Sequence, residues 1–530
     1  MWFEFAKPSQ SRSRRRPRGN GASPKWLCSV PLQSYYISSN VVERYARASV
    51  GPPKGDCNIT WKVWPPGGEP VDARVLSGDE SAATAASRHE LVATLSEETV
   101  RNDPKGRREF FTVRDHFIVF ITVCLSWSSI EAAEYKYPYR DPYLATATTT
   151  ILNDEGPTTR VKSQVVHVPG LPGRNQLPSV EGRGELSIAL YRQNHPAPLL
   201  FILAGLGSSP YFGIAPYLAS IFYRAGFHIV ILPSPMSWNF ALSASRSGAP
   251  GYASEDARDL YEVMQKSLST LRDRYNVEAK GINFMGVSLG ALEGAHLSVI
   301  DADERKIGIA KYLLVNPPVD LSDSVKKLDD WGALQNKFGS DKSKDIVAKA
   351  VAIVESFSED RRDDPAVFDR LAKKFASFST EELQFLIAEN LQSQLAELVY
   401  VTQVIHDQTV LTAPKDQARK RIQEAKNFTF TDYNEKIGVT LWRRQTAEPQ
   451  ADLESFIKRG SLEQIIVRLR NAKVHIMHNV DDPLANRKSI EELKEALADQ
   501  VTLYPYGGHL GNLWFPENKE YALRFFRTIP

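Results

Sequence analysis

The sequence has few cysteines, little net charge and no apolar run long enough to cross a membrane. Its three cysteines, Cys28, Cys57 and Cys124, all precede residue 125 of the 530-residue chain. The rest of the chain therefore excludes disulfides, a thiolate nucleophile and cysteine-ligated metal. A body without cysteine is compatible with an oxidising compartment but does not require one.

Charge is distributed unevenly along the chain, although the formal net charge is only +2. Residues 1–112 contain 17 Lys and Arg against 12 Asp and Glu, whereas the remaining residues contain 48 against 51. The body of the protein therefore lacks the basic face that a nucleic-acid-binding protein needs. No glycine-rich phosphate loop or dinucleotide fingerprint stands where a strand would meet a helix, so no cofactor is implied.

The first 112 residues do not have the pattern of a folded domain. A basic tract rich in Ser, Pro and Gly is followed by sequence with little periodicity. Such composition buries too little apolar surface to offset the entropy of ordering. We interpret residues 1–112 as a disordered extension or as the result of a mis-assigned start. A basic arm for an anionic partner is the alternative, with its charge concentrated in the first 18 residues.

Residues 113–133 resemble a secretory signal peptide. An apolar run of 11 residues, Phe117 to Trp127, follows Arg114 and is succeeded by small residues that end at Ala133. The run is too short to span a bilayer, so no stable membrane insertion is expected. We therefore expect a product that starts near Val113 and is secreted or periplasmic. The alternative is a buried strand or short helix in a cytoplasmic protein.

From residue 134 onward, apolar strands alternate with helices. Strands are predicted at 143–152, 184–192, 198–205, 227–235, 281–286, 309–318, 473–480 and 500–506. A helix is predicted over 211–225, ended by Gly226, and another over 254–275, with Ser254 as its N-cap. This alternation predicts an α/β fold with a mostly parallel sheet that helices cover on both faces.

Between residues 322 and 461 the strand pattern disappears. Three amphipathic segments predict helices, at 363–378, 379–407 and 413–425. Ser379 and Glu382 have the spacing of a capping box. We refer to residues 322–461 as the insertion and expect it to form a helical cap domain. It would separate the two parts of the core, residues 134–321 and 462–530.

The insertion carries several large apolar side chains in its helical segments. They either line an acyl pocket or form the insertion's own core, and base rates of apolar burial favour the second role for most of them. These residues are Trp331, Phe357, Phe368, Phe375, Phe378, Phe385 and Leu386.

Residues 286–290 read Gly-Val-Ser-Leu-Gly. Ser288 directly follows a predicted buried strand and directly precedes a predicted helix. This is the context of a nucleophile elbow, in which a serine projects its hydroxyl from a strained turn. Gly286 and Gly290 would leave room for the tight turn. A five-residue motif of this kind also occurs by chance, so we base the interpretation as a nucleophile elbow on its strand–turn–helix context.

With this elbow the chain resembles the α/β-hydrolase superfamily over residues 140–530, apart from the insertion. The resemblance implies an acid after a late core strand and a histidine after the last strand. Asp482, before Pro-Leu, and His509, after Gly-Gly, stand at these places. Asp481 is the alternative acid and Asp320, one strand earlier, is a more distant one.

The resemblance implies a Ser-Asp-His triad and an acyl-enzyme mechanism. Ser288 would attack a carbonyl, His509 would transfer the proton, and Asp482 would orient the imidazole. The expected activity is that of a serine hydrolase of carboxylic esters, similar to an esterase or lipase, with a small-molecule or lipid ester as substrate. A serine peptidase, a thioesterase and a non-catalytic binding protein on the same fold are the alternatives.

An oxyanion hole is also implied by the resemblance. One donor would be the backbone N–H of Leu289, and the second would lie in the loop after the strand at 198–205. The family commonly has His-Gly in that loop, whereas this chain has Ala204-Gly205. The backbone donors remain, so Leu206 is expected to supply the second N–H, with Gly207 as the alternative.

The other histidines of the body have structural interpretations. His296 lies about two turns after Ser288 on the predicted elbow helix and is expected to be packed. His475 and His478 flank a predicted strand and lack acidic partners at metal-ligand spacing. No metal site is therefore predicted.

Overall fold

The computed structural model describes two units of the chain separately. The described residues are 60–63, 71–74, 135–152, 161–357, 364–446, 449–470 and 473–527. The units are Met1–Ile121 and Thr122–Pro530. In the first, strands β1 (Thr60–Val63) and β2 (Val71–Arg74) pair antiparallel. The predicted extension and signal peptide, residues 1–133, otherwise lie outside the described residues.

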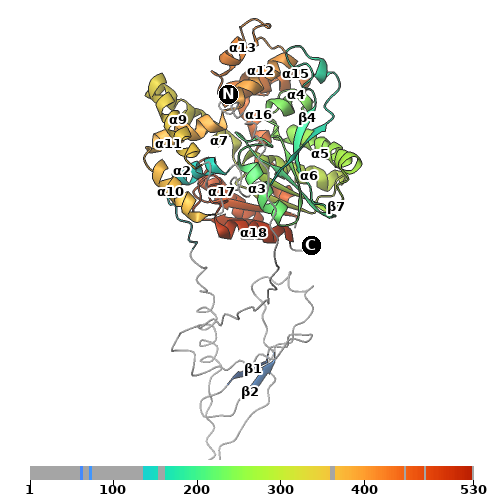
Figure 1. The fold of residues 1–530 in the computed structure, drawn as a ribbon, viewed down its shortest axis with the longest axis vertical. Helices are drawn as coiled ribbons and strands as arrows, with labels where there is room; N and C mark the ends of the chain where they lie inside the picture. The colour runs from blue at the N-terminus through green and yellow to red at the C-terminus, as the bar shows by residue number, and fades with distance from the viewer. Residues whose placement is uncertain are drawn as a thin grey trace, which may run out of the picture. The chain divides into compact units, whose positions relative to one another are not determined.

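The second unit is built on an eight-stranded sheet (Figure 1) with the order β10-β9-β8-β7-β5-β6-β4-β3. Its strands are β3 (Gln164–Val168), β4 (Leu186–Tyr191), β5 (Ala197–Leu203), β6 (His228–Leu232), β7 (Ala279–Val287), β8 (Lys311–Val315), β9 (Val474–Asn479) and β10 (Val501–Tyr504). Strand β4 is antiparallel to both of its neighbours, and the other pairings are parallel. The predicted mostly parallel sheet is confirmed, and the architecture is the α/β-hydrolase fold.

Helices cover both faces of this sheet, as predicted. One face carries α3 (Ile214–Arg224) and α18 (Pro516–Arg527), and the other carries α5 (Ala253–Tyr275), α6 (Leu289–Glu304) and α17 (Arg487–Leu497). Along β5, Leu200 and Ile202 join one apolar cluster, while Leu199, Phe201 and Leu203 join the other. Because successive side chains of a strand point to opposite faces, a strand buried on both faces is apolar throughout.

The strand predicted at 143–152 is wrong. This segment forms helix α2 (Pro142–Ala147) and the 3₁₀ helix η1 (Thr148–Ile151). The Asp141 carboxylate accepts hydrogen bonds from the first N–H groups of α2, at 2.8 and 3.0 Å, and Pro142 suits the first helical position. The threonine hydroxyls then donate to carbonyls three or four residues earlier. Local hydrogen bonding thus overrides the β propensity of threonine.

The two helices predicted before the elbow are present with small changes at their ends. Helix α3 is followed by Gly226, whose φ of 97° lies in the region that favours glycine. Helix α5 begins one residue earlier than predicted, and Tyr252 rather than Ser254 is its N-cap. Ser254 lies inside the first turn, beside Glu255, whose negative charge suits a helix N-terminus.

Between β8 and β9 the described residues contain helices and no strand. The helices are α7 (Leu321–Gly332), α8 (Leu334–Phe338), α9 (Ser340–Glu355), α10 (Pro365–Phe375), α11 (Thr380–Leu391), α12 (Leu395–Ile405), α13 (Ala418–Ala425), α14 (Phe430–Tyr433), the π-helix η3 (Asn434–Val439), α15 (Thr440–Gln445), α16 (Leu453–Gly460) and the 3₁₀ helices η4 (Leu462–Gln464) and η5 (Ile466–Leu469). The predicted capping box of Ser379 and Glu382 is present. Within the described part of the chain, no helix combines the length and apolarity needed to cross a bilayer.

The insertion packs on the core in two groups of helices. Figure 1 shows α9, α10 and α11 on one side and α12, α13 and α15 on another. Helices α10 and α11 contact α2, whereas α12 contacts α4 (Trp238–Ser243). The Phe368 ring of α10 stacks on Trp514, with centroids 4.0 Å apart and planes inclined by 3°. Trp514 lies only five residues after His509, so this group packs next to the predicted histidine loop.

The Phe368–Trp514 stack predicts a large loss of stability for Phe368→Ala. Phe368 is 1% exposed, and truncation of a buried phenylalanine costs about 3–5 kcal/mol of unfolding free energy. Val467→Ala is the control, because Val467 is 73% exposed and should change stability by about 0.5 kcal/mol or less. Denaturant unfolding measures both variants, and equal stabilities would contradict the packing described here.

Candidate active site

Ser288 stands at the sharp turn between β7 and α6. Its backbone has φ 55° and ψ −128°, a conformation that costs a non-glycine residue about 1–3 kcal/mol. Backbone hydrogen bonds hold it: the Ser288 N–H donates to the Val315 carbonyl at 2.9 Å, and the Ser288 carbonyl accepts from the Ala291 N–H at 2.8 Å and from the Leu292 N–H at 3.3 Å. The surrounding sheet and helix thus impose the turn on the serine.

The positions near Ser288 at which another segment of the backbone comes close are occupied by glycine. A Cβ atom on Gly286 would overlap the Gly290 carbonyl, and one on Gly290 would overlap the Leu203 carbonyl. A Cβ on Gly205 would lie 2.9 Å from the Ser288 Cβ and 3.1 Å from its Oγ. The elbow therefore has no room for a side chain at these positions.

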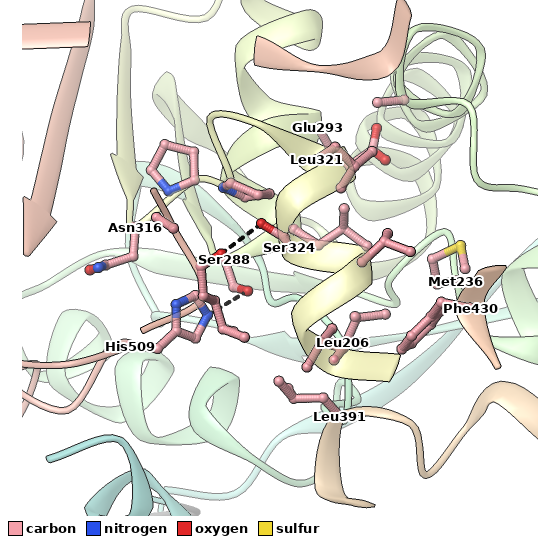
Figure 2. A pocket seen from close by; sticks show the side chains of 18 of the residues that line it. Leu206, Met236, Ser288, Glu293, Asn316, Leu321, Ser324, Leu391, Phe430 and His509 are labelled. Atoms are coloured by element: carbon pink, nitrogen blue, oxygen red, sulfur yellow. Dashed lines mark hydrogen bonds between the residues drawn. The ribbon is translucent and has the colours of Figure 1, made fainter. Parts of the chain in front are cut away.

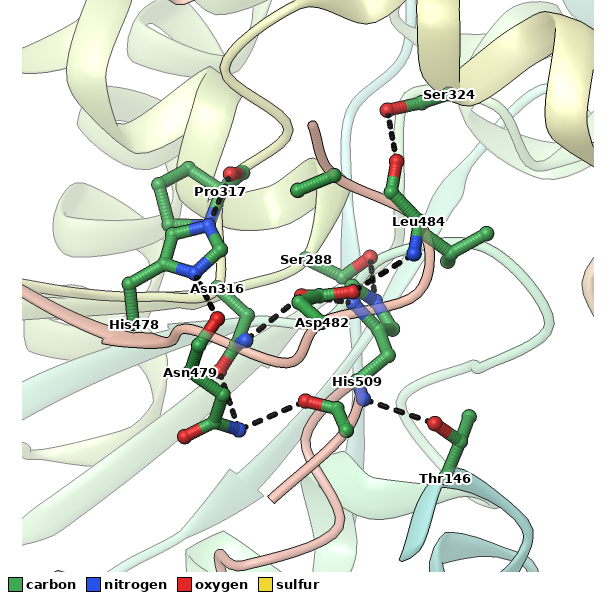
Figure 3. Close-up of polar contacts among 12 residues, drawn as sticks. Thr146, Ser288, Asn316, Pro317, Ser324, His478, Asn479, Asp482, Leu484 and His509 are labelled. Carbon is green, nitrogen blue, oxygen red and sulfur yellow. Dashed lines mark hydrogen bonds and ion pairs between the residues drawn. The ribbon is translucent and has the colours of Figure 1, made fainter. Parts of the chain in front are cut away.

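The structure brings together the three side chains that the sequence predicted for the site (Figure 3). Ser288 Oγ lies 2.8 Å from His509 Nε2, and His509 Nδ1 lies 2.8 Å from Asp482 Oδ2. Asp482 and His509 are 5% and 6% exposed. A continuous hydrogen-bonded chain thus runs from a buried carboxylate through an imidazole to a hydroxyl.

Asp482 is held as an ionised carboxylate. Asn316 Nδ2 donates to its Oδ2 at 2.7 Å, and the Leu484 N–H donates to its Oδ1 at 3.0 Å. Burial raises the pKa of Asp482, but the attraction of His509 and the hydrogen bonds from His509 and Asn316 outweigh the effect of burial and leave the pKa below its usual value. Neither Asp481 nor Asp482 caps the helix that follows, because Asn486 is the N-cap of α17.

The two alternative acids have other partners. The Asp481 carboxylate accepts hydrogen bonds from the N–H groups of Gly507 at 3.2 Å and Gly508 at 2.9 Å. Burial raises the pKa of Asp481 to about 6 even though these donors lower it. Asp320 caps α7 through its side chain. Asp481 therefore holds the loop that carries His509, while Asp320 starts the first helix of the insertion.

Helix α2 supports the histidine loop, a role that the sequence did not reveal. The His509 N–H donates to Thr146 Oγ1 at 2.8 Å. A Cβ atom on Gly508 or on Gly511 would overlap a backbone carbonyl of α2. The loop thus needs glycine in order to lie directly on the helix. The contact was missed because residues 143–152 were predicted as a strand.

Three asparagines connect the acid loop with the histidine loop. Asn479 Nδ2 donates to the Gly508 carbonyl at 2.8 Å, and Asn512 Nδ2 donates to Asn479 Oδ1 at 2.7 Å. Asn479 Nδ2 also lies 3.4 Å from Asn316 Oδ1. Two of these asparagines could have been predicted from their positions at strand ends. Asn316 directly follows β8, and Asn479 is the last residue of β9.

The two expected oxyanion donors line one cavity beside Ser288. Among the described residues, no acceptor receives a hydrogen bond from the N–H of Leu289 or of Leu206. The loop that carries Leu206 is close to the elbow, because a Cβ atom on Gly205 would lie 2.9 Å from the Leu289 nitrogen. Gly207, the alternative donor, packs instead against the Asn390 carbonyl of the insertion.

The cavity holds about 800 Å³, counted with its opening to solvent, and Ser288 and His509 lie in its wall (Figure 2). Its wall is mostly apolar and includes residues of the insertion. Those residues are Ser324, Val325, Leu328, Leu391, Phe430 and Asn434.

The large side chains singled out in the insertion do not line this cavity. They belong to or pack against the hydrophobic clusters of the protein instead, which is the second of the two roles considered. They are Trp331, Phe357, Phe368, Phe375, Phe378, Phe385 and Leu386. Size and apolarity alone therefore did not distinguish a cavity wall from a core.

The remaining histidines make structural contacts. His296 Nε2 lies 3.1 Å from the Gly460 carbonyl, and burial lowers the pKa of His296 to about 4. His475 Nε2 lies 2.9 Å from Thr502 Oγ1, and His478 contacts two backbone carbonyls. No group of three or more metal-ligating side chains occurs in the part of the chain that the structure describes.

Comparisons with known proteins identify similar folds only. No family model and no curated protein matches the chain. Among solved structures, an esterase from Pyrococcus furiosus is 12% identical over 70% of this chain and 91% of its own, with a TM-score of 0.33. A thioesterase domain from the curacin biosynthetic pathway is 11% identical over 69% and 100%, with a TM-score of 0.32. A carboxyl esterase from Bacillus coagulans is 12% identical over 69% and 97%, with a TM-score of 0.33.

The low pKa of His296 predicts a stability change with pH. In the unfolded chain the pKa is about 6.5, whereas burial lowers it to about 4 in the folded protein. The unfolded state therefore binds the proton first, and stability falls as the pH drops through this window. At about pH 5 the loss is about 2 kcal/mol relative to neutral pH. His296→Gln keeps a donor for Gly460 but does not titrate, so its unfolding free energy should fall less; an identical pH profile would contradict this.

Proposed function

We propose that the protein is a serine hydrolase that cleaves a carboxylic ester through an acyl-enzyme intermediate. The proposal rests on one observation above all, the unbroken hydrogen-bonded chain Ser288–His509–Asp482. Each of the three follows the end of a parallel strand: Ser288 follows β7, His509 follows β10 and Asp482 follows β9. Ligands of such sheets bind beyond the carboxyl ends of the strands, where the cavity also opens.

The reaction follows from the order of the three groups. Ser288 Oγ attacks the ester carbonyl while His509 Nε2 takes its proton, and Asp482 stabilises the imidazolium that forms. His509 then gives the proton to the leaving alcohol oxygen, and the acyl group remains on Ser288. Water attacks this second ester, His509 takes a proton from the water, and the released serine oxygen receives that proton as the acid departs.

The oxyanion formed in each attack needs donors that are free before the reaction. The N–H groups of Leu289 and Leu206 meet this requirement, since both residues line the cavity and neither N–H donates to a described residue. Loss of one such donor typically costs about 2.7–4 kcal/mol of transition-state stabilisation. We assign both backbone groups to the oxyanion hole.

The apolar cavity wall supports a small-molecule or lipid ester as substrate. Leu391 and Phe430 of the insertion contribute to this wall, which is the basis for regarding the insertion as a cap over the site. A peptide or a thioester has a carbonyl that the same groups would attack. A substrate panel of oxygen esters, thioesters and peptide amides therefore ranks these three substrate classes.

Labelling with a fluorophosphonate probe tests the nucleophile. The wild type should be labelled and Ser288→Ala should not, because only the serine oxygen attacks the probe. The same pair should differ in hydrolysis of p-nitrophenyl esters, with the variant losing about 10⁶-fold in kcat, as for a nucleophile knock-out in a comparable site. An unlabelled wild type, or equal labelling of both proteins, refutes the assignment.

The adjacent aspartates offer a matched pair for the acid. Asp482→Asn should lower kcat by about 10⁴-fold, because an amide at this place favours the wrong histidine tautomer. Asp481→Asn removes one acceptor from the loop backbone and should cost about tenfold. Ester hydrolysis of both variants, with melting temperatures as the folding control, measures the difference. Equal losses would sink the choice of Asp482 over Asp481.

A further inference from the structure

A buried carboxyl group without a partner stands in the wall of the cavity. Glu293 lies on α6, five residues after Ser288, and is 1% exposed. No described residue donates a hydrogen bond to its carboxyl, and its buried Oε2 has no partner. Buried polar groups in proteins usually have hydrogen-bond partners, so this group is available to a molecule that enters the cavity (Figure 2).

An amide from the insertion lines the same cavity. Asn434 is 7% exposed and begins the π-helix η3, a type of turn found frequently at functional sites. Its side chain has no hydrogen-bond partner among the described residues. The side chains of Met236, Ala253 and Phe430, which also line the cavity, are apolar. Glu293 and Asn434 therefore supply hydrogen-bonding groups from two distant parts of the chain.

The surroundings of the Glu293 carboxyl favour its protonated form. Burial raises its pKa well above the usual value, and the nearby Asp256 and Asp259 raise it further. Burial raises the pKa of both aspartates as well, but each has a donor: Gly251 N–H lies 2.6 Å from Asp256, and Arg246 lies 2.6 Å from Asp259. Glu293 has none, and a protonated carboxyl donates one hydrogen bond and accepts another.

The position of Glu293 relative to the other site residues indicates which part of a substrate it would meet. His509 must face the leaving group, because it protonates the departing oxygen. In Figure 2, Glu293 and His509 lie on opposite sides of Ser288. The group that reaches Glu293 therefore belongs to the acyl chain.

We propose that Glu293 and Asn434 form a subsite that binds a hydroxyl group on the acyl chain, so that the preferred substrates are hydroxyacyl esters. This inference rests on the proposed ester hydrolase function. A hydroxyl both donates and accepts, which matches the combined capacity of a protonated carboxyl and an amide that line the same cavity. A plain alkyl chain leaves both protein groups unpaired, and sites built to bind a hydroxyl discriminate against analogues that lack it.

Matched pairs of p-nitrophenyl esters test the subsite. Each pair consists of an alkanoate and the ω-hydroxyalkanoate of the same length, in a series of increasing length, with spontaneous hydrolysis subtracted. At the chain length where the hydroxyl reaches the subsite, the kcat/KM of the wild type should be about tenfold or more higher for the hydroxy ester than for the plain ester. Glu293→Leu and Asn434→Leu should bring this ratio close to unity.

Glu293→Gln is the matched control, because an amide keeps one donor group and one acceptor without a charge. This variant should retain the preference for the hydroxy ester. Fluorophosphonate labelling and melting temperatures show that each variant is folded. Loss of the preference in Glu293→Gln, or a stronger preference for the corresponding ω-amino ester, would mean recognition by an ionised carboxylate and would overturn the inference.

Failure of the subsite proposal can be distinguished from failure of the proposed hydrolase function. A wild type that hydrolyses plain esters but shows no preference for the hydroxyl at any length overturns the subsite alone. An unchanged ratio in Glu293→Leu does the same. A wild type that neither hydrolyses any ester nor reacts with the fluorophosphonate overturns the proposed function on which the subsite rests.

Discussion

The hydrogen bond between Asp482 and His509 joins two loops that follow different strands of the sheet. Each loop also has a support of its own: Asn316, which follows a third strand, donates to Asp482, and Thr146 of α2 accepts a hydrogen bond from the His509 N–H. The carboxylate is buried, so it stays ionised only because hydrogen-bond donors and His509 surround it. The positions of the loops and the ionised state of the carboxylate therefore depend on one another.

The same loops are also bonded to the insertion. Ser324 Oγ donates to the Leu484 carbonyl at 2.9 Å, and Lys327 Nζ donates to the Ala485 carbonyl at 3.0 Å, so α7 is bonded to the acid loop (Figure 3). On another side, the Phe368–Trp514 stack joins α10 to the region after the histidine. The cavity wall is therefore attached to the segments that carry the proposed catalytic groups.

The conformation of a segment was predicted correctly where a single strand or a single turn specifies it. Strands such as β5 are apolar throughout because both of their faces are buried, and this pattern is visible in a few residues. The error at 143–152 arose where side-chain hydrogen bonds decide the conformation, since a threonine run suits a strand until Asp141 caps it as a helix. Strand β3 was missed because only Val166 and Val168 of its residues are buried.

By itself, the sequence determined the α/β architecture, the strand–turn–helix at Ser288 and the order in which Asp482 and His509 follow later strands. These are local patterns, written in neighbouring residues. The tertiary structure alone decided that Asp482 rather than Asp481 meets the imidazole, that Thr146 supports the histidine loop, and that Glu293 and Asn434 share a cavity. Such contacts join residues far apart in the chain, and their partners are set by how helices and loops pack in space.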